Sequence, residues 1–325
     1  MVIITDEMIR HFFKLMEEIH EPLKDTFKNV HQGYPNETLK RFLKARDGDV
    51  DKAYKMLVDF LEWRILNEID TILTKPIPVD LYRALRETQL IGLSGYSKEG
   101  LPVIAVGAGL STYDKASVEY YVRSHIQMNE YRDRVILPQA SIKFGRHIAT
   151  CLKIIDMTGL RLTALSQIKL LTVILNIDDL NYPEKNETYY VTNAPYIFSA
   201  CWKVVRPLLQ ERTKKKIQVL QGSGKDELLK IIDYGSLPHF CKREGSGSSR
   251  HSRNGMSDDC FSFDHDFHQE FYNFIKKQAE LTKSTRPIIK QGSLHIDFPE
   301  SSACDVKIVE TIETELQRLG NQNCL

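Results

Sequence analysis

Two spacings of hydrophobic residues alternate in the middle of the chain. Three short apolar runs, rich in β-branched and aromatic residues, lie at 152–157, 188–193 and 217–220, and segments with helical spacing separate them. Short strands that alternate with helix-length segments are typical of strand–helix–strand units, in which the strands lie parallel. Upstream, two apolar runs flank a turn at 97–100 and predict a hairpin that opens the same sheet. The pattern therefore predicts an α/β fold with a mainly parallel, mixed β-sheet flanked by helices.

Helical spacing also dominates the N-terminal part of the chain. Apolar residues recur there every three or four positions, which is typical of amphipathic helices packed in a bundle. Asn36 and Asp49 each precede such a stretch and are expected to cap its first turn through a side-chain oxygen. Between the hairpin and the next strand, one long helix is expected from Asp114, its N-cap, up to Pro138, which should end it.

Changes in composition divide the chain into four predicted parts. The segment before the C-terminal part is rich in Gly, Ser and charge, and it buries too little apolar surface to offset the entropy of ordering it. In the C-terminal part, the pattern predicts a helix around Phe271, a strand at 294–298 and a last helix at 306–319. The parts are an N-terminal helical domain (1–75), an α/β domain (76–242), a flexible linker (243–265) and a C-terminal extension (266–325).

The composition is that of an ordinary globular protein. Of 325 residues, 42% are apolar and 27% are charged, and the formal net charge is +1. A net charge so near zero argues against a nucleic-acid binder held by a general basic field. The first residues lack a basic segment followed by an unbroken apolar core, and no apolar run approaches the thickness of a bilayer, so we expect a cytoplasmic chain. Six cysteines without regular spacing are then expected to be reduced thiols.

One helical segment differs from the others because a proline interrupts it beside a charged run. Its apolar positions recur at three- and four-residue steps until Pro207, and the run 211–216 then supplies a hydroxyl and a block of positive charge. Most apolar stripes of this kind are core helices. The alternative is a gate helix over an apolar cavity with a phosphate at one end. The gate positions would be Phe198, Trp202, Val205 and Leu209.

Three other chemistries lack essential residues. Residues 222–225 follow a strand and precede a helix, but Val219 replaces the first glycine of a phosphate-binding loop and Asp226 replaces its magnesium-binding hydroxyl. The His, Cys and Asp residues at 260–268 lack the second cysteine pair of a zinc site. No G-x-S-x-G nucleophile elbow occurs. We therefore predict no metal, no cofactor and no enzymatic activity.

Several short motifs, taken in order, carry a resemblance to a known family. Residues 39–46, the tripeptide Tyr182-Pro183-Glu184, the run 190–195 and Thr213-x-x-Lys216 before a strand resemble the CRAL-TRIO lipid-binding family, and within it the phosphatidylinositol/phosphatidylcholine transfer proteins. The similarity covers roughly residues 36–242. The resemblance implies a lipid cavity covered by the gate helix and the transfer of phosphatidylinositol between membranes.

The resemblance also implies partners and a location. The protein is expected to act as a monomer, to contact membranes transiently (the Golgi is one candidate) and to present its lipid to inositol-lipid kinases. A hypothesis of a different class is an adaptor, in which the same fold senses another hydrophobic molecule and recruits partners through its C-terminal tail without transferring lipid.

The headgroup site follows from the same resemblance. It maps phosphatidylinositol binding onto Glu184, Thr213 and Lys216, with Arg46 contributed by the helical domain. Lysine and arginine are suited to a phosphodiester, and a carboxylate to inositol hydroxyls. Asp47 follows Arg46 where the family often has a second basic residue, which would either weaken phosphate binding or leave it to Lys214, Lys215 and Lys216.

The expected site for a second ligand departs further from the family. The family has two small hydroxyl residues, two positions apart, on the strand that ends in an Ile-Met-Asp-like run. The corresponding residues here are Cys151 and Lys153. The resemblance therefore predicts that the second ligand differs from phosphatidylcholine, or that there is none.

Overall fold

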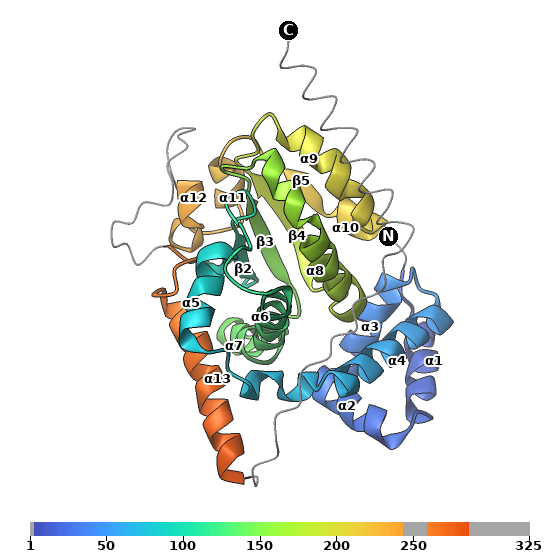
Figure 1. Cartoon of the computed structure of the whole chain (residues 1–325). Helices are drawn as coiled ribbons and strands as arrows, with labels where there is room; N and C mark the ends of the chain where they lie inside the picture. Colours follow the sequence, from blue (N-terminus) through green and yellow to red (C-terminus); the bar gives the residue numbers. More distant parts are fainter. Residues whose placement is uncertain (1–2, 243–258, 286–325) are drawn as a thin grey trace.

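The computed structural model describes residues 3–242 and 259–285, and Figure 1 shows a helical bundle beside a layered α/β domain. The bundle consists of α1 (Asp6–Glu17), α2 (Glu21–His31), α3 (Pro35–Ala45) and α4 (Val50–Leu66), and its apolar side chains form a core cluster of their own. Asp49 caps α4 as predicted, because its side chain accepts a hydrogen bond from the backbone N–H of Lys52 at 3.0 Å. The predicted Asn36 cap is wrong: α3 begins at Pro35, whose fixed φ suits the first helical position.

The sheet has five strands in the order β1-β2-β3-β4-β5. The first pair is antiparallel and the three that follow are parallel. The predicted hairpin is β1–β2, and the three predicted runs form β3, β4 and β5, which confirms the mainly parallel, mixed sheet. The strands are β1 (Ile91–Tyr96), β2 (Pro102–Val106), β3 (Cys151–Asp156), β4 (Asn186–Thr192) and β5 (Ile217–Val219).

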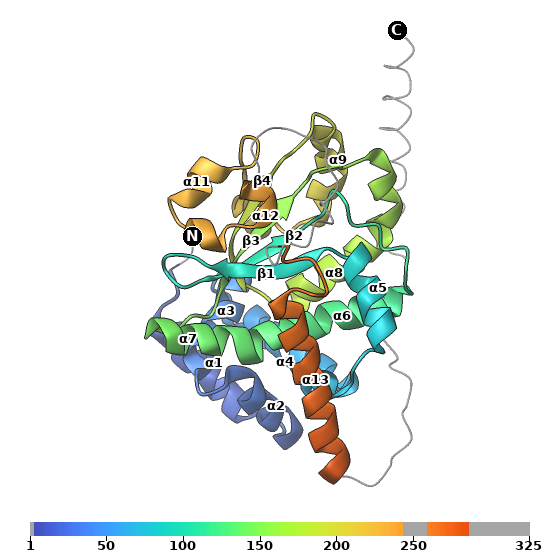
Figure 2. The ribbon, with the colours of Figure 1, turned by 90° about the vertical axis from the view of Figure 1, so that its left-hand side faces the viewer.

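Helices cover both faces of this sheet (Figures 1 and 2). Leu152 and Ile154 of β3 point to one face and pack with Phe240 of α12. Cys151 and Lys153 alternate with them and point to the opposite face, toward α6 and α8. The remaining elements are η1 (Ile69–Thr74), α5 (Val79–Thr88), α6 (Val118–Tyr131), η2 (Arg132–Ile136), α7 (Leu137–Phe144), η3 (Leu162–Gln167), α8 (Ile168–Asn181), α9 (Phe198–Val205), η4 (Arg206–Leu208), α10 (Glu211–Lys215), α11 (Lys225–Leu229), η5 (Tyr234–Ser236), α12 (His239–Lys242) and α13 (Asp266–Thr285).

The long helix before β3 differs from its prediction at both ends. Its N-cap position is occupied by Ser117, whereas the Asp114 carboxylate accepts a hydrogen bond from Thr112 at 2.6 Å. Pro138 does not end it: α6 passes through the π-helical turn η2 directly into α7, and Pro138 lies in the first turn of α7. A π-helical turn widens the backbone, which accommodates a residue that has no N–H to donate and a ring that crowds the preceding turn.

The helix α13 begins beside β1 and runs past α6, as Figure 2 shows, and it packs mainly against η1. Phe267, Phe271 and Ile275 belong to the same core cluster as residues of α5, α6 and α8. The segment that leads into α13 is also packed: Cys260 and Phe261 are buried, although the sequence assigned residues 259–265 to the linker. The rest of that linker, 243–258, and the predicted elements at 294–298 and 306–319 lie outside the described residues.

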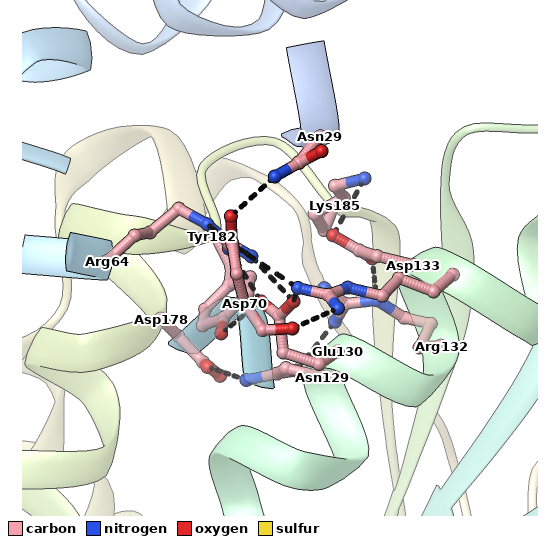
Figure 3. A network of polar contacts seen from close by, with 11 residues as sticks. Asn29, Arg64, Asp70, Asn129, Glu130, Arg132, Asp133, Asp178, Tyr182 and Lys185 are labelled. Atoms are coloured by element: carbon pink, nitrogen blue, oxygen red, sulfur yellow. Dashed lines mark hydrogen bonds and ion pairs between the residues drawn. The ribbon is translucent and has the colours of Figure 1, made fainter. Parts of the chain in front are cut away.

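A buried polar network connects the bundle to the α/β domain (Figure 3). Arg64 of α4 donates hydrogen bonds to both carboxylate oxygens of Glu130 of α6, at 2.8 and 2.9 Å, and another to Asp70 at 2.8 Å. Tyr182 donates its hydroxyl to Glu130 at 2.8 Å. The network fixes α4 against α6 and the end of α8, and so fixes where α3 meets the turn between α8 and β4, at Pro183. None of the helices in the described part of the chain is both long and apolar enough to cross a bilayer.

Candidate functional site

The charged residues of the predicted headgroup site meet where the bundle contacts the sheet. Lys216, directly after α10, donates from Nζ to Glu184 Oε2 at 2.6 Å and to the backbone O of Asn186 at 3.0 Å. Glu184 lies in the turn between α8 and β4 with φ of +59°, in the left-handed region that residues with a side chain seldom adopt. A backbone conformation of this kind persists only where surrounding contacts hold it, and such conformations cluster at ligand sites.

Three of the four predicted residues line one small cavity. Glu184, Thr213 and Lys216 surround a volume of about 20 Å³, together with Asp179 and Arg212. Thr213 and Lys216 lie three residues apart, and the neighbouring Thr213 side chain lowers the pKa of Asp179. A cavity of this size holds about one water molecule. The site is therefore closed in this conformation, with its charges paired to one another.

Arg46, the fourth predicted residue, lies beside this cavity but does not line it. It follows the last residue of α3, and its Nη1 donates to the backbone O of Ala45 at 3.0 Å. The same carbonyl also accepts a hydrogen bond from Nη1 of Arg212. Burial lowers the pKa of Arg46, and the neighbouring charge of Arg212 lowers it further.

Arg212 is the functional candidate that sequence reasoning missed. Its Nε lies 3.5 Å from Glu184 Oε1, and its Nη2 donates to the backbone O of Asp179 at 3.2 Å. Of the three lysines predicted to compensate for Asp47, Lys214 pairs with Glu211 at 2.7 Å, Lys215 is exposed and Lys216 lines the cavity. The signal was available: Arg212 immediately precedes Thr213, at the start of the helical turn that presents Thr213 and Lys216.

One acidic group at this site has an unusual pKa. Burial raises the pKa of Asp179 to about 6, and the negative charge of Asp178 also raises it, whereas Arg212 opposes the shift. The Asp179 carboxyl is therefore poised to gain or lose a proton under mildly acidic conditions. Its charge is coupled to the two arginines and the threonine at the edge of the cavity.

The two residues predicted for a second ligand face the same side of β3 but differ in surroundings. Cys151 is buried, and its Sγ donates to Asn186 Oδ1 at 3.2 Å. Burial raises the pKa of this thiol. Lys153 Nζ lies 3.8 Å from Asp178 Oδ2 and 5.5 Å from the centre of the Tyr189 ring. Neither side chain reproduces a small hydroxyl, because Cys151 is enclosed and Lys153 brings a charge.

The predicted gate helix packs apart from the main core. Phe198 and Trp202 stack with ring centres 5.8 Å apart, and both are partly exposed. Val204 joins a small cluster with Leu165 and Ile168, which is separate from the large clusters around the sheet. The α-helix ends at Val205, and Pro207 lies in the 3₁₀ turn that follows, as the proline predicts. Of the four predicted gate positions, Phe198, Trp202 and Val205 are partly exposed and Leu209 is buried.

Comparison with known families gives two matches. The model of the CRAL/TRIO domain matches residues 86–242, and that of the CRAL/TRIO N-terminal domain matches residues 8–59. The boundaries of the predicted domains are not tested by these matches and stay predictions.

Three characterised relatives are similar over about two thirds of the chain. They are the phosphatidylinositol/phosphatidylcholine transfer proteins SFH9 and SFH11 of Arabidopsis thaliana, with 32% and 29% identity over 68% of this chain, and the SEC14 cytosolic factor of Eremothecium gossypii, with 30% identity over 69%. The chain spans 40% and 62% of the two Arabidopsis proteins and 73% of the SEC14 cytosolic factor.

A solved structure supports the same fold. The crystal structure of Sfh5 superposes with a TM-score of 0.57 and covers 87% of this chain and 100% of its own, at 16% identity. At this identity the likeness concerns the fold alone.

Proposed function

The chain belongs to the CRAL-TRIO family, and on that basis we propose that it binds phosphatidylinositol and transfers it between membranes. The observation that carries the proposal is the convergence of Glu184, Thr213 and Lys216 on one cavity. These three residues come from the α8–β4 turn and from the end of α10, and they supply a carboxylate, a hydroxyl and a cation. That set matches the phosphate and the hydroxyls of an inositol headgroup.

The paired charges suggest how the headgroup enters. A lipid phosphate takes the place of the Glu184 carboxylate at Lys216 Nζ and accepts a further hydrogen bond from Thr213. Glu184, released from that contact, accepts hydrogen bonds from inositol hydroxyls. Arg212 and Arg46 keep the surroundings positive while the anion binds. The exchange conserves charge pairing, so it avoids leaving a partly buried ion without a partner.

Transfer also requires shelter for the acyl chains. Each buried methylene contributes about 0.8 kcal/mol, so roughly thirty methylenes hold a phospholipid in its bilayer by about 20 kcal/mol or more. A carrier must therefore offer comparable apolar burial and open it at a membrane. We assign the opening to α9: its packing in a small separate cluster and the break at Pro207 favour movement of this helix relative to the sheet. Phe198 and Trp202 are suited to the membrane interface.

The proposal extends to partners and location. Transient contact with membranes, among which the Golgi is one candidate, and presentation of the lipid to inositol-lipid kinases are the extensions that the family resemblance supports. The two Arabidopsis relatives are named as transfer proteins, and lipid carriage needs no catalytic group. Monomeric action is part of the same proposal.

Lipid bound to the purified protein provides the direct test. Mass spectrometry of the lipid that co-purifies with the full chain should detect phosphatidylinositol, and vesicle assays should show its transfer to acceptor membranes. Recovery of another hydrophobic molecule, without phosphatidylinositol and without transfer, would instead support the adaptor.

The identity of the second ligand gives a separate test. The Lys153 ammonium disfavours the quaternary ammonium of choline on the same face of β3, so we expect transfer of phosphatidylcholine to be weak. The double variant Cys151→Ser with Lys153→Thr restores two hydroxyls and should raise phosphatidylcholine transfer about tenfold, as expected when an unfavourable charge contact of about 1.4 kcal/mol is removed. Efficient phosphatidylcholine transfer by the unchanged protein would contradict the assignment.

A further inference from the structure

A second and larger cavity lies on the other side of the turn that carries Glu184. It has a volume of about 470 Å³ and separates the α2–α3 corner of the bundle from α7 and the loop after it. Lys185 lines both this cavity and the headgroup cavity, so the turn forms a wall between them. Cavities of roughly 300 to 1,000 Å³ are typical of sites for small molecules. We name this space the corner cavity.

Positive charge is in excess at the floor of the corner cavity. Lys185 and Arg132 share a single carboxylate: Lys185 Nζ lies 3.0 Å from Asp133 Oδ2, and Arg132 Nε donates to Asp133 Oδ1 at 2.7 Å. Arg41 also lines the cavity, and its one side-chain hydrogen bond within the described residues goes to the backbone O of Pro183 at 3.1 Å. The cavity lining therefore holds Arg41, Lys185 and Arg146 against two acids, Asp133 and Glu37.

Burial is the main cause of the lowered pKa values of Lys185 and Arg41. Burial lowers the pKa of Lys185 to about 8, and the charge of Arg41 lowers it further despite the attraction of Asp133. Burial likewise lowers the pKa of Arg41 to about 10. A buried cation whose pKa is lowered in this way is stabilised when an anion binds nearby, because the anion compensates for the solvation that burial removed.

The mouth of the corner cavity carries further donors. The Tyr34 ring stacks on His147 with centres 3.9 Å apart. Arg146 is exposed beside them; its Nε and Nη2 donate to the backbone O of Glu99 at 3.1 and 2.5 Å, and its Nη1 has no hydrogen-bond partner among the described residues. His31 Nδ1 accepts a hydrogen bond from the backbone N–H of Gly33 at 3.1 Å, which leaves Nε2 as its donor. The other acid in the lining, Glu37, pairs with Lys40 at 2.9 Å. The mouth is thus basic and aromatic, above a floor with an unmatched positive charge.

We propose that the corner cavity binds a phosphate group, held between Arg41 and Lys185 at the floor and Arg146 and His147 at the mouth. The group could belong to a soluble phosphate ester or to a membrane lipid headgroup, and the chemistry of recognition is the same. The bound phosphate group would contact the bundle through Arg41 of α3 and the α/β domain through Lys185, which is next to Glu184. The proposal is argued from side chains other than Glu184, Thr213 and Lys216, and Lys185 is the one residue that lines both cavities.

The test uses inorganic pyrophosphate and the full chain. Ring Cε1–H resonances of His31 and His147, assigned with His31→Ala and His147→Ala variants, report on this cavity. Pyrophosphate should shift both resonances saturably in the unchanged protein. Arg146→Ala, an exposed change, and Lys185→Met should each weaken this binding about tenfold, as the loss of one charge-assisted contact implies. Lys143→Ala, which removes a neighbouring cation that does not line the cavity, should leave it unchanged.

Further arms separate the site from the headgroup site and identify the source of the phosphate. Lys216→Met should leave the pyrophosphate-induced shifts intact. Vesicles that contain a phosphatidylinositol phosphate should compete with pyrophosphate for the two histidines if the source is a lipid, and should fail to compete if it is soluble; both results support the site. Absence of saturable shifts, or shifts lost in Lys216→Met and retained in Arg146→Ala and Lys185→Met, would overturn the proposal.

Discussion

Two ion-pair centres lie close together in this protein, and they are built differently. In the first, Arg64 is 4% exposed and binds both oxygens of Glu130, which is 2% exposed and also accepts the Tyr182 hydroxyl. In the second, Lys216 meets a single oxygen of Glu184, and the two side chains remain 25% and 14% exposed beside a cavity. The first centre is enclosed and fully bonded, whereas the second is accessible to a competing anion.

The difference shows how one motif serves two purposes. Tyr182 and Glu184 are two residues apart, yet the first helps to hold the bundle on the α/β domain and the second faces the candidate ligand site. A buried ion pair held by several hydrogen bonds does not readily exchange one partner for a ligand, because the charge left behind would be buried without a counter-ion. A partly exposed ion pair held by one contact beside a cavity can exchange a partner for a ligand at a small cost in free energy. The predictions below test this contrast.

The largest expected effect is on stability at the first centre. Glu130→Gln removes the charge that Arg64 and Arg134 share and leaves Asp70 as the one carboxylate paired with the buried Arg64 guanidinium among the described residues. We expect the free energy of unfolding to fall by about 3 to 5 kcal/mol, the usual cost of breaking a buried pair. Urea denaturation measures it. Glu62→Gln, on the exposed side of α4, is the control and should change stability by less than about 0.5 kcal/mol. A loss below about 1 kcal/mol at Glu130 would contradict the assigned role.

The second centre should show the opposite pattern. Lys216→Met should reduce phosphatidylinositol transfer at least about tenfold, since a charge-assisted contact to phosphate is lost. Its effect on the free energy of unfolding should stay within about 1 kcal/mol, because the pair with Glu184 is partly exposed. Transfer between vesicles and urea denaturation measure the two quantities. The control is Lys215→Met, an exposed neighbour. Unchanged transfer in Lys216→Met would disprove the headgroup assignment.

The fold could be read from the sequence where the period of apolar residues was unambiguous. The β-branched runs gave β3, β4 and β5 to within two residues at each end, and Pro207 gave the end of α9. The reading failed at Pro138, because a π-helical turn depends on how α6 packs and leaves no mark in local propensity. It also assigned Phe261 to a linker, since the Gly- and Ser-rich composition before it obscured a single aromatic residue that the sheet buries.

The candidate site was predictable only where residues belong to a motif. Glu184, Thr213 and Lys216 were expected together and line one cavity. Arg46 was expected there too, but its guanidinium donates to the Ala45 carbonyl, which also accepts a hydrogen bond from Arg212. The contact between Arg212 and Ala45 spans 167 positions in the sequence. Spacing cannot reveal such long-range packing. For the same reason the corner cavity was not predicted, because α2, α3 and the loop after α7 contribute to it separately.

A third prediction concerns the gate helix. Trp202→Asp places a charge among the apolar side chains of α9 and should slow the loading of phosphatidylinositol from vesicles about tenfold, because the helix loses an interfacial aromatic anchor. Since Trp202 is partly exposed and its neighbours form a small cluster, the loss of stability should be below about 2 kcal/mol. Loading kinetics and thermal unfolding measure these effects. Ser199→Asp, on the exposed side of α9, is the control. A larger stability loss with normal loading would place Trp202 in the core.

The smallest expected effect is a pH dependence that separates the two centres. The pKa of Asp179 is about 6 in the folded protein, raised mainly by burial, and an unfolded aspartate titrates near 3.8. Between about pH 4 and pH 6 the folded state therefore binds more protons than the unfolded state, so Asp179 makes stability fall as the pH rises through this window. Above it the penalty is complete, and solvent screening of a partly exposed group limits it to about 1 kcal/mol.

Asp179→Asn should remove this slope and stabilise the protein at pH 7 by about 1 kcal/mol, measured by urea denaturation at several pH values. Asp51→Asn, an exposed change on α4, should leave the slope in place. If Asp179→Asn kept the full pH dependence, the titrating group near the headgroup cavity would be another one. If the slope disappears and Lys216→Met alters transfer without altering stability, the second centre is electrostatically adjustable, as ligand exchange at Glu184 requires.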